Sequence, residues 1–361
     1  MLHRILTLIA AGFYYSGLIR LARWWLERSG PHLVILNYHR ASGGDLRRQM
    51  LYLRKHYRVL HLEEALKMLY MPDPSASHQG DRRTPLVMTF DDGYHDYFSY
   101  GAALAKELQV PITVFLVPGY IERGGRFWWD EGAHLVADAQ VKAATVEGRT
   151  YHLDNASERQ ELSQVIDRRA RCAASVSERE EFLAMMRQLL KVPVPVHLEE
   201  KPATPLSWEE VEALKENEWV SIGAHTMNHP TLSCLTDIDE LRYEIKQCRA
   251  VLEQRLGRAV RTFAYPIGKF EHIGSLVPRL AKEAGYDCAL TTEDGLNTPR
   301  TDPYLMRRVV VDVDQHWMMV AAKACGLWGL IFGPWRKFAR LIRKESIKQG
   351  IMTDIPLSQS V

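Results

Sequence analysis

The stretch Val87-Met88-Thr89-Phe90-Asp91-Asp92-Gly93-Tyr94 joins a short apolar run to two adjacent acids and a glycine. A short apolar run that ends in polar residues is typical of a buried strand. Because side chains alternate in direction along an extended chain, the two carboxylates can serve different purposes. One could bind a metal while the other acts as a general base, and Gly93 permits a sharp turn after them. An isolated Asp-Asp-Gly is more often a helix cap, so this hypothesis needs support from elsewhere in the chain.

The same pattern of an apolar run ended by polar residues recurs along the chain. Together with 86–90, the predicted strands are 33–39, 112–117, 219–224, 262–265, 288–291 and 308–313. Predicted helices alternate with them at 45–56, 62–70, 97–108, 208–217, 237–256 and 276–284. This alternation predicts an α/β fold with parallel strands and helices outside. Loops that follow such strands gather at one face, so we expect Asp91, Asp92, His225, His229 and Pro266 to share one rim.

The regular alternation is interrupted between about 121 and 205. This segment is rich in charged, helix-favouring residues, and we interpret it as a mainly helical insertion in a domain that spans 31–315. It contains Phe127-Trp128-Trp129-Asp130, whose aromatic rings could face a sugar. Neighbouring tryptophans are more often part of a core, and that alternative stays open here.

The bulk composition excludes some classes of partner. The 361 residues contain 46 Lys plus Arg and 44 Asp plus Glu, so no overall field favours nucleic acid. Five scattered cysteines without close pairs argue against a disulfide scaffold and favour a reducing compartment.

Both ends of the chain are apolar, aromatic and basic. The run 5–19 is uncharged but shorter than the ~20 residues that span a bilayer, and arginines and tryptophans follow it between 20 and 28. The tail 316–361 has an aromatic stretch followed by a basic cluster at 336–344. We predict that 1–30 and 316–361 associate with a membrane surface, as peripheral helices or a single anchor. The arginine bias favours the cytoplasmic face, and packing of both ends on the core is the competing interpretation.

A pair of histidines offers a metal site. In Gly223-Ala224-His225-Thr226-Met227-Asn228-His229-Pro230, the two histidines are four residues apart and follow a predicted strand. They can hold one divalent ion, and Asp92 would complete a three-ligand site with positions open to water and substrate. Zn²⁺ is the first choice of metal, and these ligand types also suit Fe, Co or Ni. Such a site beside a free carboxylate indicates hydrolysis of an amide or ester.

These motifs together resemble the polysaccharide deacetylase family, also called NodB homology or carbohydrate esterase family 4. Thr-Phe-Asp-Asp-Gly at 89–93 and His-Thr-Met-Asn-His at 225–229 match its first two motifs, and Phe-Ala-Tyr-Pro-Ile-Gly at 263–268 resembles the third. Val-Ile-Leu-Asn-Tyr-His-Arg at 34–40 resembles the opening strand of the branch that acts on poly-N-acetylglucosamine exopolysaccharides. The resemblance covers about 33–313 and implies a distorted (β/α)7 barrel.

The resemblance also implies roles for individual residues. Asp91 would be the catalytic base, and Asp92, His225 and His229 the metal ligands. The backbone N–H at Ile267 would stabilise the oxyanion formed when water attacks the acetyl carbonyl.

The chain departs from the family pattern at three places. Ala264 stands where many members have an arginine that orients the base, and Ile267 stands where many have a tyrosine, although a backbone donor survives either change. No late Leu-x-His supplies the general acid. His39 and His316 are candidates for that acid or for a substrate contact, although an ordinary structural role is commoner for either.

The sequence therefore predicts a metal-dependent N-deacetylase that acts on an N-acetylated amino sugar in a polysaccharide, oligosaccharide or lipid-linked glycan. One alternative is a catalytically silent carbohydrate-binding member of a polysaccharide assembly complex. The missing arginine favours that alternative, while retention of Asp91 beside the metal ligands disfavours it. Another is a related hydrolase with the same chemistry, such as a deformylase or an O-deacetylase.

Overall fold

The computed structural model describes residues 2–72, 81–193 and 203–332, and its centre is a curled parallel sheet. The sheet runs in the order β10-β1-β3-β4-β7-β8-β9, with the short β2 paired to β3. A parallel bridge between Leu290 and Met306 links β9 to the residues just ahead of β10, which brings the two edges of the sheet together. The predicted distorted (β/α)7 barrel is confirmed. Its strands are β1 Val34–Tyr38, β2 Arg58–Val59, β3 Pro85–Phe90, β4 Ile112–Leu116, β7 Val220–Ala224, β8 Thr262–Ala264, β9 Cys288–Leu290 and β10 Val309–Val310.

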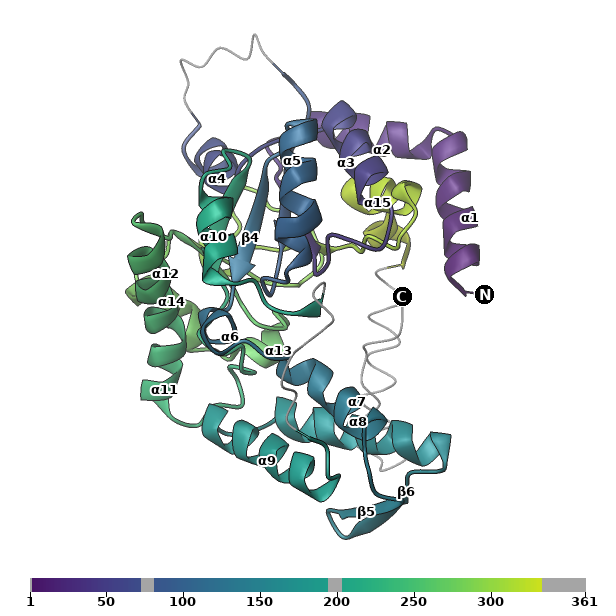
Figure 1. Cartoon of the computed structure of the whole chain (residues 1–361). Coiled ribbons are helices and arrows are strands. Elements are labelled where there is room, and N and C mark those ends of the chain that lie inside the picture. Colours follow the sequence, from purple (N-terminus) through teal and green to yellow (C-terminus); the bar gives the residue numbers. More distant parts are fainter. Residues whose placement is uncertain (1, 73–80, 194–202, 333–361) are drawn as a thin grey trace.

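Helices cover the outside of the sheet (Figure 1). Those of the barrel are α3 Leu46–His56, α4 Leu62–Tyr70, α5 Ala102–Leu108, α6 Pro118–Arg123, α10 Trp208–Lys215, α11 Ile238–Arg242, α12 Cys248–Leu256, α13 Phe270–Ile273, α14 Val277–Glu283 and α15 Trp317–Ala324. The predicted helices at 97–108 and 237–256 each contain a π-helical turn, at Tyr97–Gly101 and Tyr243–Gln247. Such turns are frequent near functional sites, and both carry a side chain that bonds to the site described below.

Side-chain alternation divides the strands into an outer and an inner face. Leu33, Ile35, Val87 and Phe115 belong to a small inner cluster, which α4 completes with Leu62, Ala65 and Leu69. Asn37, Thr89 and Asp91 lie on the same inner face by this alternation, closer to the carboxyl ends of the strands than the apolar cluster. Gly223 lies beside the Phe115 ring, where an added Cβ would be 2.4 Å from a ring carbon. The barrel interior is therefore apolar below and polar at the rim.

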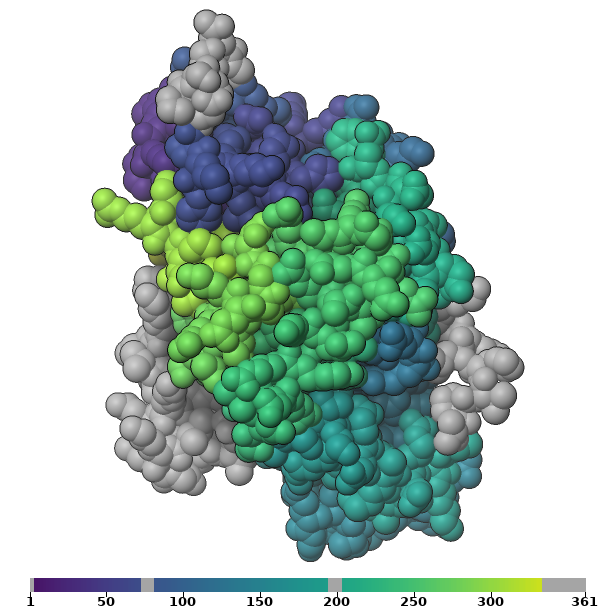
Figure 2. Space-filling model, turned by 90° about the vertical axis from the view of Figure 1, so that its left-hand side faces the viewer, coloured from purple at the N-terminus to yellow at the C-terminus, as the bar shows by residue number. Residues whose placement is uncertain are grey.

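The insertion forms a lobe next to this rim. It contains α7 Trp128–Ala137, the hairpin β5 Ala143–Val146 and β6 Arg149–His152, α8 Ala156–Arg171 and α9 Val176–Leu189. The arrow of β4 points toward the lobe, which projects from the barrel body (Figures 1 and 2). The hairpin was not part of the predicted mainly helical insertion. Its turn uses Glu147 and Gly148 at φ 52° and 79°, the left-handed pair that suits a two-residue hairpin loop.

The N-terminal segment forms two helices, α1 Leu2–Tyr15 and α2 Leu18–Arg28, bent by 67° at their junction. No single helix among the described residues meets the length and hydropathy needed to cross a bilayer, whereas this bent pair meets them jointly. The helix α1 packs against α15, and Tyr14 lies edge-on to Trp317. The predicted basic cluster at 336–344 lies outside the described residues.

Candidate active site

The structure brings the three predicted metal-ligating side chains together. Asp92 follows β3, while His225 and His229 follow β7, and all three are buried. The Nε2 atoms of His225 and His229 lie 3.5 and 3.4 Å from Asp92 Oδ1. One ligand atom from each residue falls within 4.8 Å of the others. Two imidazole nitrogens and one carboxylate oxygen, converging at this separation, fit a divalent ion with open coordination positions.

The backbone of this rim is strained at four residues. Asp92, Thr226, His229 and Ile267 have φ of 76°, 63°, 54° and 61°, and they are four of the seven non-glycine residues with positive φ in the described parts of the chain. Such conformations cost about 1–3 kcal/mol each and persist where surrounding bonds fix them. The His229 N–H donates to Thr226 Oγ1 at 2.9 Å, for example. The strain is thus concentrated where the predicted ligands and the predicted oxyanion donor lie.

His225 is oriented by the strand that carries the third motif. Its Nδ1 lies 2.7 Å from the carbonyl of Ala264, so Nδ1 carries a proton, and in the neutral ring Nε2 holds the lone pair that a metal would take. Burial alone would lower the pKa of His225, but Asp91 and Asp92 outweigh it and raise the pKa. Burial, the neighbouring His225 and Arg179 hold the pKa of His229 well below its usual range. Neutral His229 is the form that can ligate a metal.

The loop between the two histidines is held by the second π-helical turn. Buried Glu244 accepts hydrogen bonds from the Asn228 backbone N–H at 2.8 Å and from Asn228 Nδ2 at 2.7 Å. The residue next to the second ligand is therefore fixed through both its main chain and its side chain.

Asp91 lies beside the three ligands and is held by a buried arginine. Arg308 donates from Nη1 to Asp91 Oδ1 at 2.7 Å and from Nη2 to Oδ2 at 2.8 Å, and Asn37 Nδ2 donates to Oδ2 at 2.8 Å. Burial by itself would raise the pKa of Asp91, but the Arg308 guanidinium and His225 outweigh it and lower the pKa to about 2. The Asp91 carboxylate is ionised at neutral pH, oriented on both oxygens, and 4.0 Å from His225 Nε2.

Sequence reasoning missed Arg308, which was predicted only as the first residue of the last strand. The side chain is fully buried, and it also donates to the Thr291 carbonyl and to Thr89 Oγ1. It supplies the guanidinium that the third motif lacks at Ala264. The available signal was an arginine directly before the apolar run 309–311 of a predicted buried strand, since such a charge needs a buried partner.

The other two predicted catalytic positions lie at the same rim. His39 is exposed directly after β1, and the Tyr97 hydroxyl donates to its carbonyl at 2.6 Å. The same hydroxyl contacts the Asp91 carbonyl oxygen and shares its one proton between the two acceptors, so the first π-helical turn ties the two residues together. Ile267 is half-buried after β8, and its carbonyl accepts from Thr292 Oγ1 at 2.7 Å. By contrast, His316 caps α15 by accepting the Met318 N–H, which is a structural role.

The aromatic stretch of the insertion is divided between core and site. Phe127 and Trp128 are buried, whereas Trp129 is half-buried, with its ring 4.3 Å from that of His229. Trp129 Nε1 donates to Tyr94 Oη at 2.8 Å. Burial and the charge of Asp92 raise the pKa of Asp130 to about 6. The half-buried Trp129 ring therefore borders the metal-ligating side chains on the accessible side.

Residues 78–289 match the sequence family described as polysaccharide deacetylase. The chain belongs to this family. Membership makes it an enzyme that deacetylates a polysaccharide, as the first two motifs predicted, and the family is metal-dependent. The three converged side chains of this polysaccharide deacetylase could hold the ion. No curated protein sequence matches the chain.

Solved structures support the fold. The Streptococcus pyogenes deacetylase PplD in complex with acetate has 15% identity and a TM-score of 0.53, covering 82% of this chain and 99% of that one. IcaB from Ammonifex degensii has 20% identity and a TM-score of 0.51, covering 82% and 98%. The BpsB deacetylase domain from Bordetella bronchiseptica has 16% identity and a TM-score of 0.50, covering 79% and 97%. At these identities the likeness shows a shared barrel.

Proposed function

We propose that this polysaccharide deacetylase removes N-acetyl groups from an amino sugar in a polysaccharide, oligosaccharide or lipid-linked glycan, with Zn²⁺ held by Asp92, His225 and His229. The observation that carries the proposal is the buried Asp91 carboxyl group, which Arg308 and Asn37 bond on both oxygens beside those three side chains. A catalytically silent relative has no need of such a carboxylate. The histidine and carboxylate ligand set suits Zn²⁺, which when bound would polarise the acetyl carbonyl and acidify water.

The chain's own groups then account for the proton movements. Asp91 accepts a proton from the attacking water, because its carboxylate is ionised and oriented. The Ile267 backbone N–H donates to the oxyanion that develops on the carbonyl oxygen. His39, at the exposed side of the rim, protonates the leaving amine as the C–N bond breaks. Water and the acetamide are thereby converted to acetate and a free amine on the sugar.

Acetate release from an N-acetylglucosamine oligomer tests this function. We expect Asp91→Asn to lower kcat by at least about 100-fold, because a general base contributes about 10²–10⁴-fold. Zn²⁺ content measured on the same samples should stay near one per chain in Asp91→Asn and fall to near zero in His229→Ala. Unchanged acetate release by Asp91→Asn would reject the base assignment. Release of formate or O-linked acetate from matched substrates, without N-acetyl hydrolysis, would favour the related hydrolases.

His39 has its own test. We expect His39→Gln to lower kcat by about 10- to 100-fold at pH 7 while leaving Zn²⁺ content unchanged, because it would remove only the proton donor. The loss should shrink with an activated anilide substrate, whose leaving group needs less protonation. An equal loss with both substrates would exclude His39 as the acid.

We also propose that the enzyme sits on the cytoplasmic face of a membrane through α1 and α2. On these helices Leu8, Tyr15, Leu21 and Trp25 are 72, 79, 58 and 60% exposed, which is unusual for large apolar side chains on adjacent helices. Glu27 is the single acid before Asp45, against five arginines in the same stretch. An apolar face with aromatic and arginine residues suits the headgroup layer of an anionic leaflet.

Flotation of the full chain with vesicles tests the surface. We expect binding to phosphatidylglycerol-containing vesicles that weakens at least tenfold in Leu21→Ser/Trp25→Ser. Met185→Ser is the matched control, since this side chain is 53% exposed on α9 of the insertion. Equal flotation of the parent and the double variant would contradict the proposal.

A further inference from the structure

The insertion holds the main chain of the second histidine in the candidate metal site. Trp128 Nε1, at the start of α7, donates to the His229 carbonyl at 2.8 Å. Arg179, on α9, donates from Nη1 to the same carbonyl at 3.4 Å and from Nη2 to the Asn228 carbonyl at 3.1 Å. Two helices of the insertion thus supply three hydrogen bonds to two consecutive carbonyls of the loop.

Both donors are buried, although each carries a polar group. Trp128 and Arg179 are each 2% exposed. The Arg179 guanidinium lies 5.6 Å from the Trp128 ring centroid and 2.8 Å from Glu180, whose side chain is 45% exposed. Burying a guanidinium is costly unless its donors are satisfied, and here the two loop carbonyls and Glu180 accept from it.

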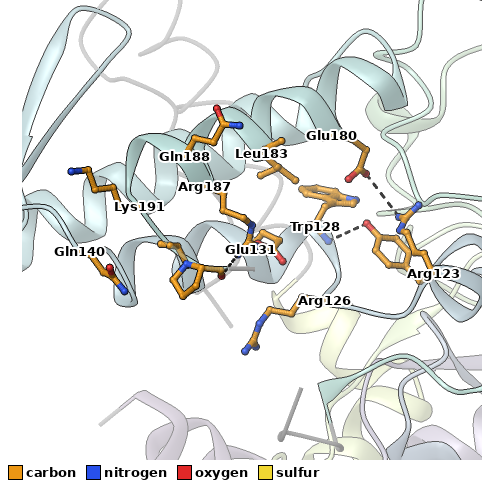
Figure 3. A pocket seen from close by; sticks show the side chains of 14 residues that line it. Arg123, Arg126, Trp128, Glu131, Gln140, Glu180, Leu183, Arg187, Gln188 and Lys191 are labelled. Carbon is orange, nitrogen blue, oxygen red and sulfur yellow. Dashed lines mark hydrogen bonds and ion pairs between the residues drawn. The ribbon is translucent and has the colours of Figure 1, made fainter. Parts of the chain in front are cut away.

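Trp128 is also held by contacts with residues outside the His229 loop. Its backbone N–H donates to Tyr120 Oη at 3.1 Å, and its indole lies near Leu183 of α9 in the wall of a cavity of about 670 Å³ (Figure 3). The indole thus lines this cavity and also donates through Nε1 to the His229 carbonyl. Trp128 is therefore held through both its main chain and its indole.

His229 needs such support because of its backbone conformation. At φ 54° it occupies the left-handed region, which disfavours a side chain with a Cβ. Thr226 Oγ1 accepts its N–H, while the insertion binds its carbonyl, so the peptide groups on both sides of the residue are fixed. The direction of the His229 ring depends on both contacts.

We propose that Arg179 and Trp128 are positioning residues for the metal site, and that the insertion sets the direction of His229 through its main chain. This inference rests on the proposed function, since it requires that His229 ligate a metal. Each residue donates to a carbonyl of the loop and not to the metal-ligating atoms, so its effect is on metal affinity and ligand geometry. The insertion is then part of the active-site framework.

Metal binding to full-length variants tests the proposal. Co²⁺ titration followed by d–d absorption reports ligand geometry, and competition with a chromophoric chelator gives the Zn²⁺ dissociation constant. We expect Arg179→Met to weaken Zn²⁺ binding about 10- to 100-fold and to alter the Co²⁺ spectrum, as loss of groups that orient ligands usually does. Arg179→Lys should give an intermediate affinity. Trp128→Phe removes one N–H while retaining an aromatic ring, and should weaken binding about tenfold.

Arg187→Met is the matched control. Arg187 is also on α9, but it bonds to Glu131 at 2.6 Å within the insertion, so its loss should leave Zn²⁺ affinity unchanged. At saturating Zn²⁺ we expect Arg179→Met to recover most of the parent kcat. Equal Zn²⁺ affinity of Arg179→Met, Trp128→Phe and the parent would overturn the proposal, as would an equal loss in Arg187→Met. A parent protein that binds neither ion would instead overturn the metal site itself.

Discussion

Replacing Arg308 by methionine removes the charge that holds Asp91 while leaving an apolar side chain in the barrel interior. Arg308 is fully buried and bonds to both carboxylate oxygens of Asp91, at 2.7 and 2.8 Å. In Arg308→Met, Asn37 still donates to one oxygen, at 2.8 Å. The carboxylate then remains buried without its cationic partner.

The size of the effect follows from the pKa of Asp91. Burial opposes ionisation, yet Arg308 and the nearby His225 bring the pKa from 3.8 down to about 2. That difference corresponds to about 2.4 kcal/mol at about 1.36 kcal/mol per pH unit. Without the guanidinium, burial dominates, and we expect the pKa to rise beyond its ordinary value. The acid limb of kcat/KM should move up by at least about two pH units and appear between about pH 4 and 6.

The same shift determines a stability change and its sign. The native state holds the Asp91 pKa below its unfolded value, so the pair stabilises the fold above about pH 4 and loses that contribution as pH falls toward about 2. At pH 7 we expect Arg308→Met to lower the free energy of unfolding by about 2–4 kcal/mol, because a buried charge loses its partner. At pH 3 the deficit should be smaller.

The assay is acetate release from an N-acetylglucosamine oligomer across pH 4–9 at saturating Zn²⁺, with urea unfolding at pH 7 on the same samples. Arg308→Lys keeps the charge but cannot grip both oxygens, so its pH profile should lie between those of the parent and Arg308→Met. Exposed Arg307 gives the control, and Arg307→Met should match the parent. A profile and unfolding free energy of Arg308→Met that coincide with the parent's would refute the role of Arg308.

Three further perturbations give separate checks. Burial raises the pKa of Asp130 to about 6, so the ionised carboxylate destabilises the fold as pH rises through 6. Asp130→Asn should therefore raise the free energy of unfolding by about 1–3 kcal/mol at pH 8 and leave it unchanged at pH 4. Thermal unfolding with chelator present measures both values. Tyr97→Phe removes the hydroxyl that bonds to the Asp91 carbonyl and should lower kcat about tenfold with Zn²⁺ affinity unchanged. Gly223→Ala places a Cβ 2.4 Å from the Phe115 ring and should cost about 1–3 kcal/mol in urea unfolding.

The barrel could be predicted from the sequence because each central strand is a short apolar run that ends in polar residues. The run before Asp91 was predicted as 86–90 and observed as Pro85–Phe90, and that before His225 as 219–224 and observed as Val220–Ala224. In a parallel barrel both runs deliver their following residues to one rim. The proximity of Asp92, His225 and His229 therefore followed from local pattern plus topology.

Contacts across the structure could not be predicted in the same way. The bond between Trp128 and the His229 carbonyl depends on how the insertion packs on the barrel, and no spacing in the sequence encodes that. The hairpin depends on Glu147 and Gly148 adopting left-handed conformations, although Glu147 is not a residue that signals such a turn. Arg308 is 217 residues from Asp91, so its role became visible only with the strands in register.

The position of Arg308 suggests an experiment in which the arginine is moved from position 308 to position 264. Ala264 and Phe115 belong to the same inner cluster, and the Arg308 guanidinium lies 5.9 Å from the Phe115 ring centroid. Guanidinium groups reaching in from 264 or from 308 would therefore compete for one space below Asp91. We expect Ala264→Arg alone to destabilise the barrel, because it adds a second buried cation. In Ala264→Arg/Arg308→Met we expect the acid limb of kcat/KM to return toward the parent position, by at least one pH unit relative to Arg308→Met. If the double variant is folded and its limb stays where Arg308→Met places it, the two positions are not equivalent, and orientation of Asp91 requires the strand β10 itself.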